Sequence, residues 1–117
     1  MTTEMSTCTP KPQLEERRLL TRAQADELGG VFKVLTSGTR LRLLHALARE
    51  GEMCVTDLAS TVRMKPQAVS NQLQRLVEWG VVEARANGNF VHYRIVDPCV
   101  TSLLHSGLCL VEDAKKR

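Results

Sequence analysis

Four cysteines, Cys8, Cys54, Cys99 and Cys109, carry the most distinctive chemistry in this sequence. A thiolate is a nucleophile, a redox centre and a ligand for soft or borderline ions such as Zn, Cd, Pb, Hg or As(III). None of the four has the CxxC spacing of a zinc finger. Residues 1–12 contain neither the apolar segment nor the cleavage site of a secretory signal, so we expect a cytoplasmic protein. A reducing compartment favours metal binding or redox sensing over structural disulfides.

The cysteines fall into two groups, each of which could bind an ion. Cys54 lies at the start of a predicted helix, where the positive end of the dipole favours the thiolate, and Cys8 lies on an N-terminal arm that could fold over it. Cys99 and Cys109 lie on the last predicted helix, about 15 Å apart along its axis, which is too far to share an ion within one chain. An antiparallel pair of these helices would bring Cys99 of one chain towards Cys109 of the other.

The last helix offers a second possible ligand set. His105, Cys109 and Glu112 recur at i, i+4 and i+7, and Asp97 and Asp113 add oxygen donors near the two ends. The simpler alternative is that Cys99 and Cys109 pack as small hydrophobic residues and His105 lies at the surface. The residues alone leave these alternatives open.

Hydrophobic periodicity predicts a mainly helical domain over residues 21–114, preceded by a flexible arm over residues 1–20. A capping box at Thr21 and Gln24 predicts a first helix that ends near Gly38. Residues 39–49 predict a buried central helix ended by Gly51. The charged residues of this helix must lie at the edge of the core or pair with other groups. They are Arg40, Arg42 and Arg49.

The two helical patterns at residues 55–62 and 66–79, separated by three residues, are typical of a helix-turn-helix. After them, Asn87-Gly88-Asn89 between two β-prone runs predicts a hairpin wing. Amides, hydroxyls and arginines on the second helix and the wing suit base edges and phosphates, although a solvated helix face and a structural β-arm are the plainer interpretations. His92 and Arg94 also lie on the wing. The predicted DNA-contacting residues are Lys65, Gln67, Ser70, Asn71, Gln74, Arg75, Arg85, Asn87 and Asn89.

A last helix opens at Asp97-Pro98 and carries an apolar stripe from Val100 to Val111, in which Gly107 permits close approach. The stripe either docks on its own domain or forms half of a dimer interface. We favour a homodimer through the terminal helices. A two-fold symmetric dimer matches a two-fold DNA site, and a small domain gains stability from burying more apolar surface.

Composition excludes several classes of protein. The chain has 117 residues, a net charge of +3 and 3% aromatic residues, so it lacks the stacking platform of a single-strand binder, whereas double-stranded DNA remains possible. No apolar stretch approaches the roughly 20 residues of a membrane span. We also find no nucleophile paired with a plausible base and no phosphate-gripping glycine loop, and therefore do not expect an enzyme.

Three stretches of the chain resemble the ArsR/SmtB family of winged-helix repressors, over about residues 25–111. Residues 32–44, FKVLTSGTRLRLL, are similar to the opening motif of the family. Residues 52–58, EMCVTDL, are similar to its metal box ELCVCDL, with Thr56 in place of the second cysteine. Residues 67–76, QAVSNQLQRL, followed by Gly80-Val81-Val82, are similar to its recognition helix.

This resemblance implies a winged helix-turn-helix homodimer that binds a palindromic operator and releases it when a metal or metalloid ion binds. It implies two places for the ion, one at the metal box with the N-terminal arm and one between the last helices. Cys54 and Cys8 match the first place; Asp97, Cys99, Cys109 and Asp113 lie at or near the second. Because some members sense oxidants or persulfides with two cysteines, a thiol-based redox repressor is the alternative function.

Overall fold

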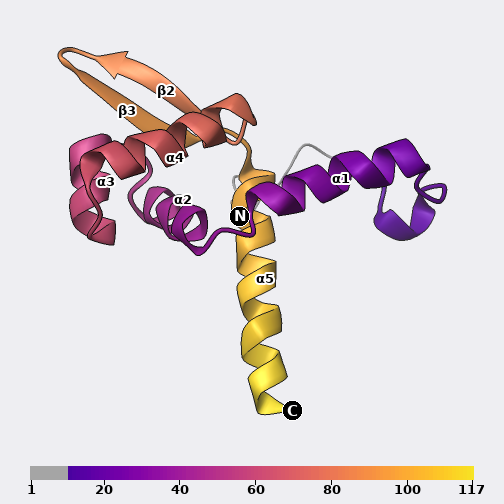
Figure 1. Ribbon diagram of the computed structural model, residues 1–117. Helices are drawn as coiled ribbons and strands as arrows, with labels where there is room; N and C mark the ends of the chain where they lie inside the picture. The colour runs from indigo at the N-terminus through magenta and orange to yellow at the C-terminus, as the bar shows by residue number, and fades with distance from the viewer. Residues whose placement is uncertain (1–10) are drawn as a thin grey trace, which may run out of the picture.

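The computed structural model describes residues 11–117, in which five α-helices and a three-stranded antiparallel sheet form a winged helix-turn-helix (Figure 1). The predicted flexible arm over residues 1–20 lies partly outside this range, and Cys8 lies wholly outside it. In chain order the elements are a short 3-10 turn at Leu14–Glu16 (η2), α1 (Arg22–Val34), α2 (Gly38–Glu50), β1 (Met53–Cys54), α3 (Val55–Val62), α4 (Pro66–Glu78), β2 (Val82–Asn87), β3 (Phe90–Ile95) and α5 (Pro98–Lys116).

Local capping sets the ends of the first two helices. The predicted capping box is confirmed, since Thr21 Oγ1 accepts from the Gln24 amide at 3.1 Å and Gln24 Oε1 accepts from the Thr21 amide at 3.0 Å. α1 ends at Val34, a few residues before the expected boundary, because Ser37 caps α2 by accepting from the Arg40 amide at 3.3 Å. Gly51, with φ of 90°, ends α2 as predicted.

The core lies where α2, α3 and α4 meet the base of the sheet. Each of these helices buries apolar residues, and the apolar stripe that the periodicity predicted for α4 is confirmed at Val69, Leu73 and Leu76. The fully buried side chains are Leu43, Leu44, Leu47, Leu58, Val69, Leu73, Leu76 and Val82. Arg42 finds its partner at the end of α3, where it donates to the carbonyl of Val62 at 3.1 Å.

The wing is confirmed, and it has one strand more than the predicted hairpin. β3 pairs with β2 from Asn87 opposite Phe90 down to Val82 opposite Ile95, and on its other edge it pairs with β1. The reversal occurs at Gly88-Asn89, where Gly88 adopts a φ of 66° that suits the first position of a two-residue hairpin loop.

α5 extends away from the body of the domain, on the side opposite the wing (Figure 1). Its first two turns pack against the core through Val100 and Leu104. Beyond them, the apolar stripe is open, with Leu108 and Val111 each about half exposed. Of the helices in residues 11–117, none combines the length and apolar character that spanning a membrane requires.

Candidate functional site

α4 has a polar face directed outward and an apolar face that is buried. Val69, Leu73 and Leu76 are fully buried and fix the rotation of the helix about its axis. This rotation leaves the predicted reading residues at the surface: Gln67, Asn71, Gln74 and Arg75 are exposed and Ser70 is half-buried. Lys65 and Pro66 occupy the N-cap and first position, so a positive charge stands at the positive end of the helix dipole.

Two of the predicted reading residues on α4 are hydrogen-bonded to each other. Gln67 Nε2 donates to Asn71 Oδ1 at 3.0 Å, which orders two amides one helical turn apart. Both side chains are exposed, and each amide keeps further donors and acceptors for bidentate contact with a base edge. The arrangement can therefore read DNA, provided that α4 enters a major groove.

The wing presents its own polar groups next to α4. Arg85, Asn87 and Asn89 are exposed on β2 and the turn, as the sequence predicted. One charged residue of this surface was not predicted from the sequence: Glu83 forms ion pairs with Arg94, which lies directly opposite, and with Arg85 at 3.4 Å. The signal for it was the alternation along β2, which places residues 83 and 85 on one face of the strand.

Cys54 lies at the junction of β1 and α3, where it is half-buried at the N-cap position of α3. Its Cα stands opposite that of His92 in the sheet. His92 Nδ1 lies 3.3 Å from Glu52 Oε2, and this contact links β3 to the segment before β1. The predicted location of Cys54 at the start of a helix is thus correct, and an imidazole lies on the neighbouring strand.

α5 carries the other candidate ligands. Asp97 caps the helix by accepting from the amide of Cys99 at 2.8 Å, so its carboxylate already has a structural role. Cys109 Sγ lies 3.6 Å from His105 Nε2, which brings together two members of the predicted His105, Cys109 and Glu112 set. Within residues 11–117 of a single chain, no three His, Cys, Asp or Glu side chains gather closely enough to hold a metal ion.

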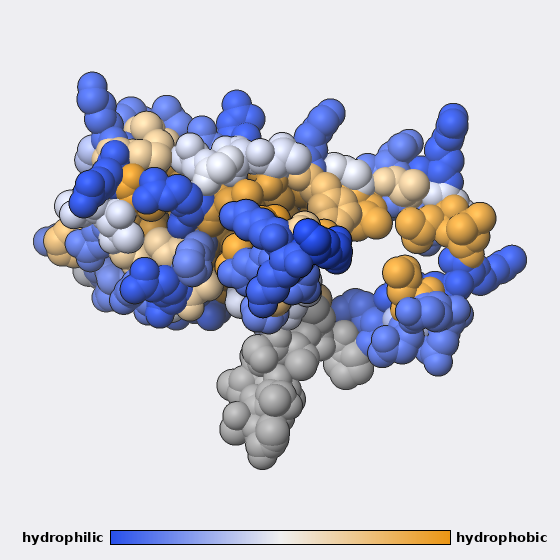
Figure 2. Space-filling view, turned by 90° about the horizontal axis from the view of Figure 1, so that it is seen from below, coloured by the Kyte–Doolittle hydropathy of each residue, from blue (hydrophilic) through white to orange (hydrophobic). Residues whose placement is uncertain are grey.

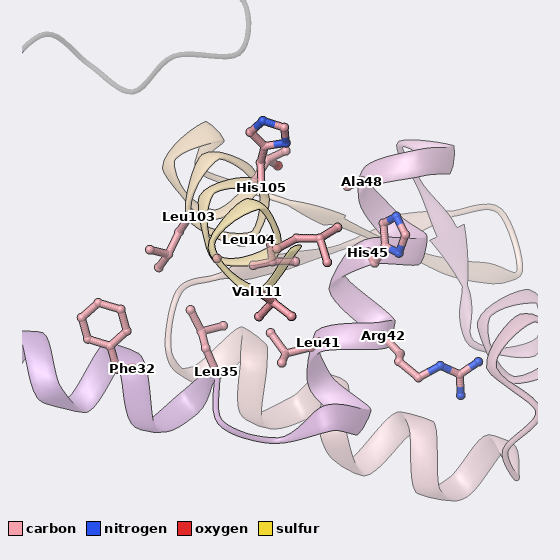
Figure 3. A pocket seen from close by; sticks show the side chains of 13 residues that line it. Phe32, Leu35, Leu41, Arg42, His45, Ala48, Leu103, Leu104, His105 and Val111 are labelled. Atoms are coloured by element: carbon pink, nitrogen blue, oxygen red, sulfur yellow. The ribbon is translucent and has the colours of Figure 1, made fainter. Parts of the chain in front are cut away.

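A largely apolar groove of about 670 Å³ separates α5 from α1 and α2. Figure 3 shows Leu35, at the end of α1, pointing into this space together with Leu41 of α2 and Val111 of α5. His45, Arg42 and His105 also line it. Figure 2, seen along α5 from its C-terminal side, shows hydrophobic surface beside this helix and along α1. The exposed apolar side chains of α1 include Leu28, Val31 and Phe32, each 40% to 47% exposed.

Comparison with known proteins gives consistent similarities. Residues 37–84, which run from the N-cap of α2 into the wing, match the family described as bacterial regulatory protein, arsR family. The cadmium resistance transcriptional regulatory protein CadC of Listeria innocua is 33% identical over 86 residues, which are 74% of this chain and 72% of that protein.

Two solved structures extend the similarity to the whole fold. The crystal structure of the antimony-specific transcriptional repressor AntR is 58% identical, covers 95% of this chain and all of its own, and superimposes with a TM-score of 0.79. The homodimeric winged helix-turn-helix DNA-binding domain from Mycobacterium bovis, solved by NMR, is 32% identical with a TM-score of 0.72, over 83% of this chain and 89% of that domain.

Proposed function

The chain belongs to the ArsR family of bacterial regulatory proteins, and from this premise we propose that it is a homodimeric repressor that releases its operator when a soft metalloid or metal ion binds its cysteine thiolates. The family consists of DNA-binding transcriptional regulators, and the chain is accordingly a regulator of the metal-responsive type rather than an enzyme. The observation that carries the finer proposal is the 58% identity to an antimony-specific repressor, in a chain with two cysteines on α5.

The reading surface consists of α4 and the wing. α4 enters the major groove with its exposed amides and Arg75, while Arg85 and the wing asparagines contact the neighbouring phosphates or minor groove. The exposure of these side chains and the Gln67–Asn71 hydrogen bond support this assignment.

The dimer forms through α1 and α5. Several apolar side chains on these helices are roughly half exposed, among them Phe32, Leu108, Leu110 and Val111. Of these, Phe32, Leu108 and Val111 line the groove of Figure 3. Such a continuous apolar surface marks an interaction site. Its occupant is a second copy of the chain, because the related domain from Mycobacterium bovis is homodimeric and a two-fold operator needs two reading helices.

In the reduced protein, the ion binds between the two α5 helices, to Cys99 of one chain and Cys109 of the other. The structure gives Cys99 in a disulfide, which must be reduced before its sulfur can bind an ion. Sulfur donors suit As(III), Sb(III), Cd, Pb or Hg, and with added nitrogen or oxygen donors they also suit Zn. His105 stands beside Cys109 as an additional donor at 3.6 Å from its sulfur. The alternative site is formed by Cys54 with Cys8. This site lacks one thiolate, because Thr56 replaces the second cysteine of the metal box.

Release then follows from linkage. An ion that binds only one arrangement of the two α5 helices shifts the dimer population away from the DNA-competent arrangement, by as much as its affinities for the two arrangements differ.

Fluorescence anisotropy of the reduced protein on DNA from its own promoter tests the proposal. We expect release by Sb(III) or As(III) at lower concentrations than by Cd(II), Pb(II), Hg(II) or Zn(II). Release by a divalent ion alone would replace the metalloid assignment. Release by an oxidant or persulfide donor alone would instead make the protein a thiol-based redox repressor.

A further inference from the structure

Arg40, in the first turn of α2, joins two other helices through one guanidinium. Its Nη1 donates to the carbonyl of Val34 at 2.8 Å, and its Nε donates to Gln72 Oε1 at 3.0 Å. Val34 is the last residue of α1, and Gln72 lies in the middle of α4. Both bonds are partly buried. The side chain thus bridges the end of α1 and the helix proposed to read DNA.

The chemistry of both partners suits an arginine. The carbonyls in the last turn of a helix lack intrahelical donors and stand at the negative end of its dipole, so the Val34 carbonyl attracts a cation. Gln72 is half-buried, and its oxygen accepts the second bond. A planar guanidinium can satisfy both acceptors in a fixed geometry, whereas a lysine ammonium is a single point charge on a flexible stem.

A second contact joins the same two helices. A Cβ placed on Gly30 of α1 would lie 3.4 and 3.5 Å from two ring carbons of Trp79, at the C-cap of α4, so the indole rests against the glycine. Gly30 and Val34 are four residues apart on α1, and Gln72 and Trp79 are seven apart on α4, so each pair lies on one helix face. The two contacts therefore form one α1–α4 seam.

We infer that Arg40 is a positioning residue that sets the orientation of α4 relative to α1 by closing this seam. The inference rests on the proposed function, in which α1 belongs to the dimer interface and α4 reads the operator. A change in how the two chains meet moves α1, and the seam passes that movement to α4. Arg40 contributes to specificity through the placement of α4 rather than through a DNA contact of its own.

Arg40→Lys tests the inference because it keeps the positive charge and removes the planar guanidinium that bonds both acceptors. We expect operator affinity to fall about tenfold, as the loss of a charged, partly buried hydrogen bond would give. Affinity for an unrelated duplex at the same salt concentration should stay unchanged, because that binding depends on charge. Gln72→Met, which removes the acceptor at similar volume, should act in the same way. The double variant should be no weaker than the weaker single variant.

Arg49→Lys is the matched control, since it lies on the same helix and is exposed. It should change neither affinity. Trp79 is the only tryptophan, so its emission reports on the seam without DNA. Arg40→Lys and Gln72→Met should shift this emission to the red and increase quenching by acrylamide, and Arg49→Lys should not.

These readouts separate two kinds of failure. A wild-type protein with no operator preference would overturn the proposed function, and the emission of Trp79 would still decide whether Arg40 closes the seam. An unchanged ratio of operator to unrelated-duplex affinity in both Arg40→Lys and Gln72→Met, with unchanged Trp79 emission, would overturn the inference. Thermal unfolding of each variant identifies a loss that comes only from a smaller folded fraction, and Gln72→Met decides the matter if Arg40→Lys does not fold.

Discussion

Glu83 and Arg94 stand directly opposite each other on β2 and β3 and form an ion pair across the wing. The same carboxylate lies 3.4 Å from Arg85 Nη2. All three side chains are partly exposed, so the pairs themselves contribute little to stability. Their consequence concerns DNA, because phosphates must compete with Glu83 for the two arginines.

Replacing Glu83 by glutamine should therefore strengthen DNA binding. With the carboxylate removed, both arginines are free to meet phosphates, and we expect affinity to rise about threefold or more at low salt, with a steeper dependence on salt concentration. Anisotropy titrations over a range of KCl concentrations measure both quantities. Glu52→Gln is the control, since it also removes one negative charge but frees a histidine rather than an arginine. Equal effects of the two variants would mean that only net charge matters.

Substitutions of the α4 amides and of the wing arginine should affect DNA binding in different ways. Asn71→Ala or Gln74→Ala should weaken operator binding by about 1 to 3 kcal/mol and leave binding to unrelated DNA nearly unchanged, because these amides read base edges. Arg85→Ala should weaken both and lower the salt slope by about one, as the loss of a phosphate contact predicts. Parallel titrations on operator and unrelated duplex distinguish the two patterns.

Ser106→Ala, an exposed change on α5, serves as the control for these variants and should alter neither affinity. If Asn71→Ala and Gln74→Ala both lowered the two affinities by the same factor, α4 would not be the element that reads sequence.

Most elements of this fold could be predicted from the sequence because their signals are local. The capping box at Thr21, the stop at Gly51 and the apolar stripe of α4 depend on residues within a few positions of each other. β1 could not be predicted, since two residues carry no periodicity and Met53 pairs with Tyr93, forty positions away. The hairpin was predicted, while the glycine of its turn proved to come first in the loop.

The candidate site also has parts that the local sequence predicts and parts that it does not. Polar residues on one helix face were identified from spacing alone, and the structure leaves most of them exposed. The Arg40 bridge was visible only as a charged residue in need of a partner, because its acceptors belong to two other helices. The ligands of a shared ion depend on a second chain, which a single sequence does not place.

Asp97 has two candidate roles that substitution can separate. As the N-cap of α5 it accepts from the Cys99 amide, so Asp97→Ala should lower the free energy of unfolding by about 1 kcal/mol. Asp97→Asn should preserve stability, because asparagine caps as well as aspartate does. Denaturant unfolding measures both. If Asp97 also binds the ion, Asp97→Asn alone should raise the ion concentration needed for operator release; an unchanged response would leave it a cap only.

The arrangement of the α5 cysteines across the dimer gives the last prediction. Cys99→Ser and Cys109→Ser should each bind the operator normally and fail to release it with Sb(III) or As(III), because each removes one donor from both shared sites. Cys54→Ser should respond as the wild type does. Anisotropy on the operator during ion titration measures each response.

Mixing the two α5 variants tests the sharing itself. A heterodimer of Cys99→Ser and Cys109→Ser chains has one site with both thiolates, Cys99 from one chain and Cys109 from the other, so part of the response should return after subunit exchange. Within one chain the two residues lie about 15 Å apart along α5, so an unshared site would gain nothing from mixing. Lost release in Cys54→Ser, together with normal release in both α5 variants, would move the sensor to the junction of β1 and α3.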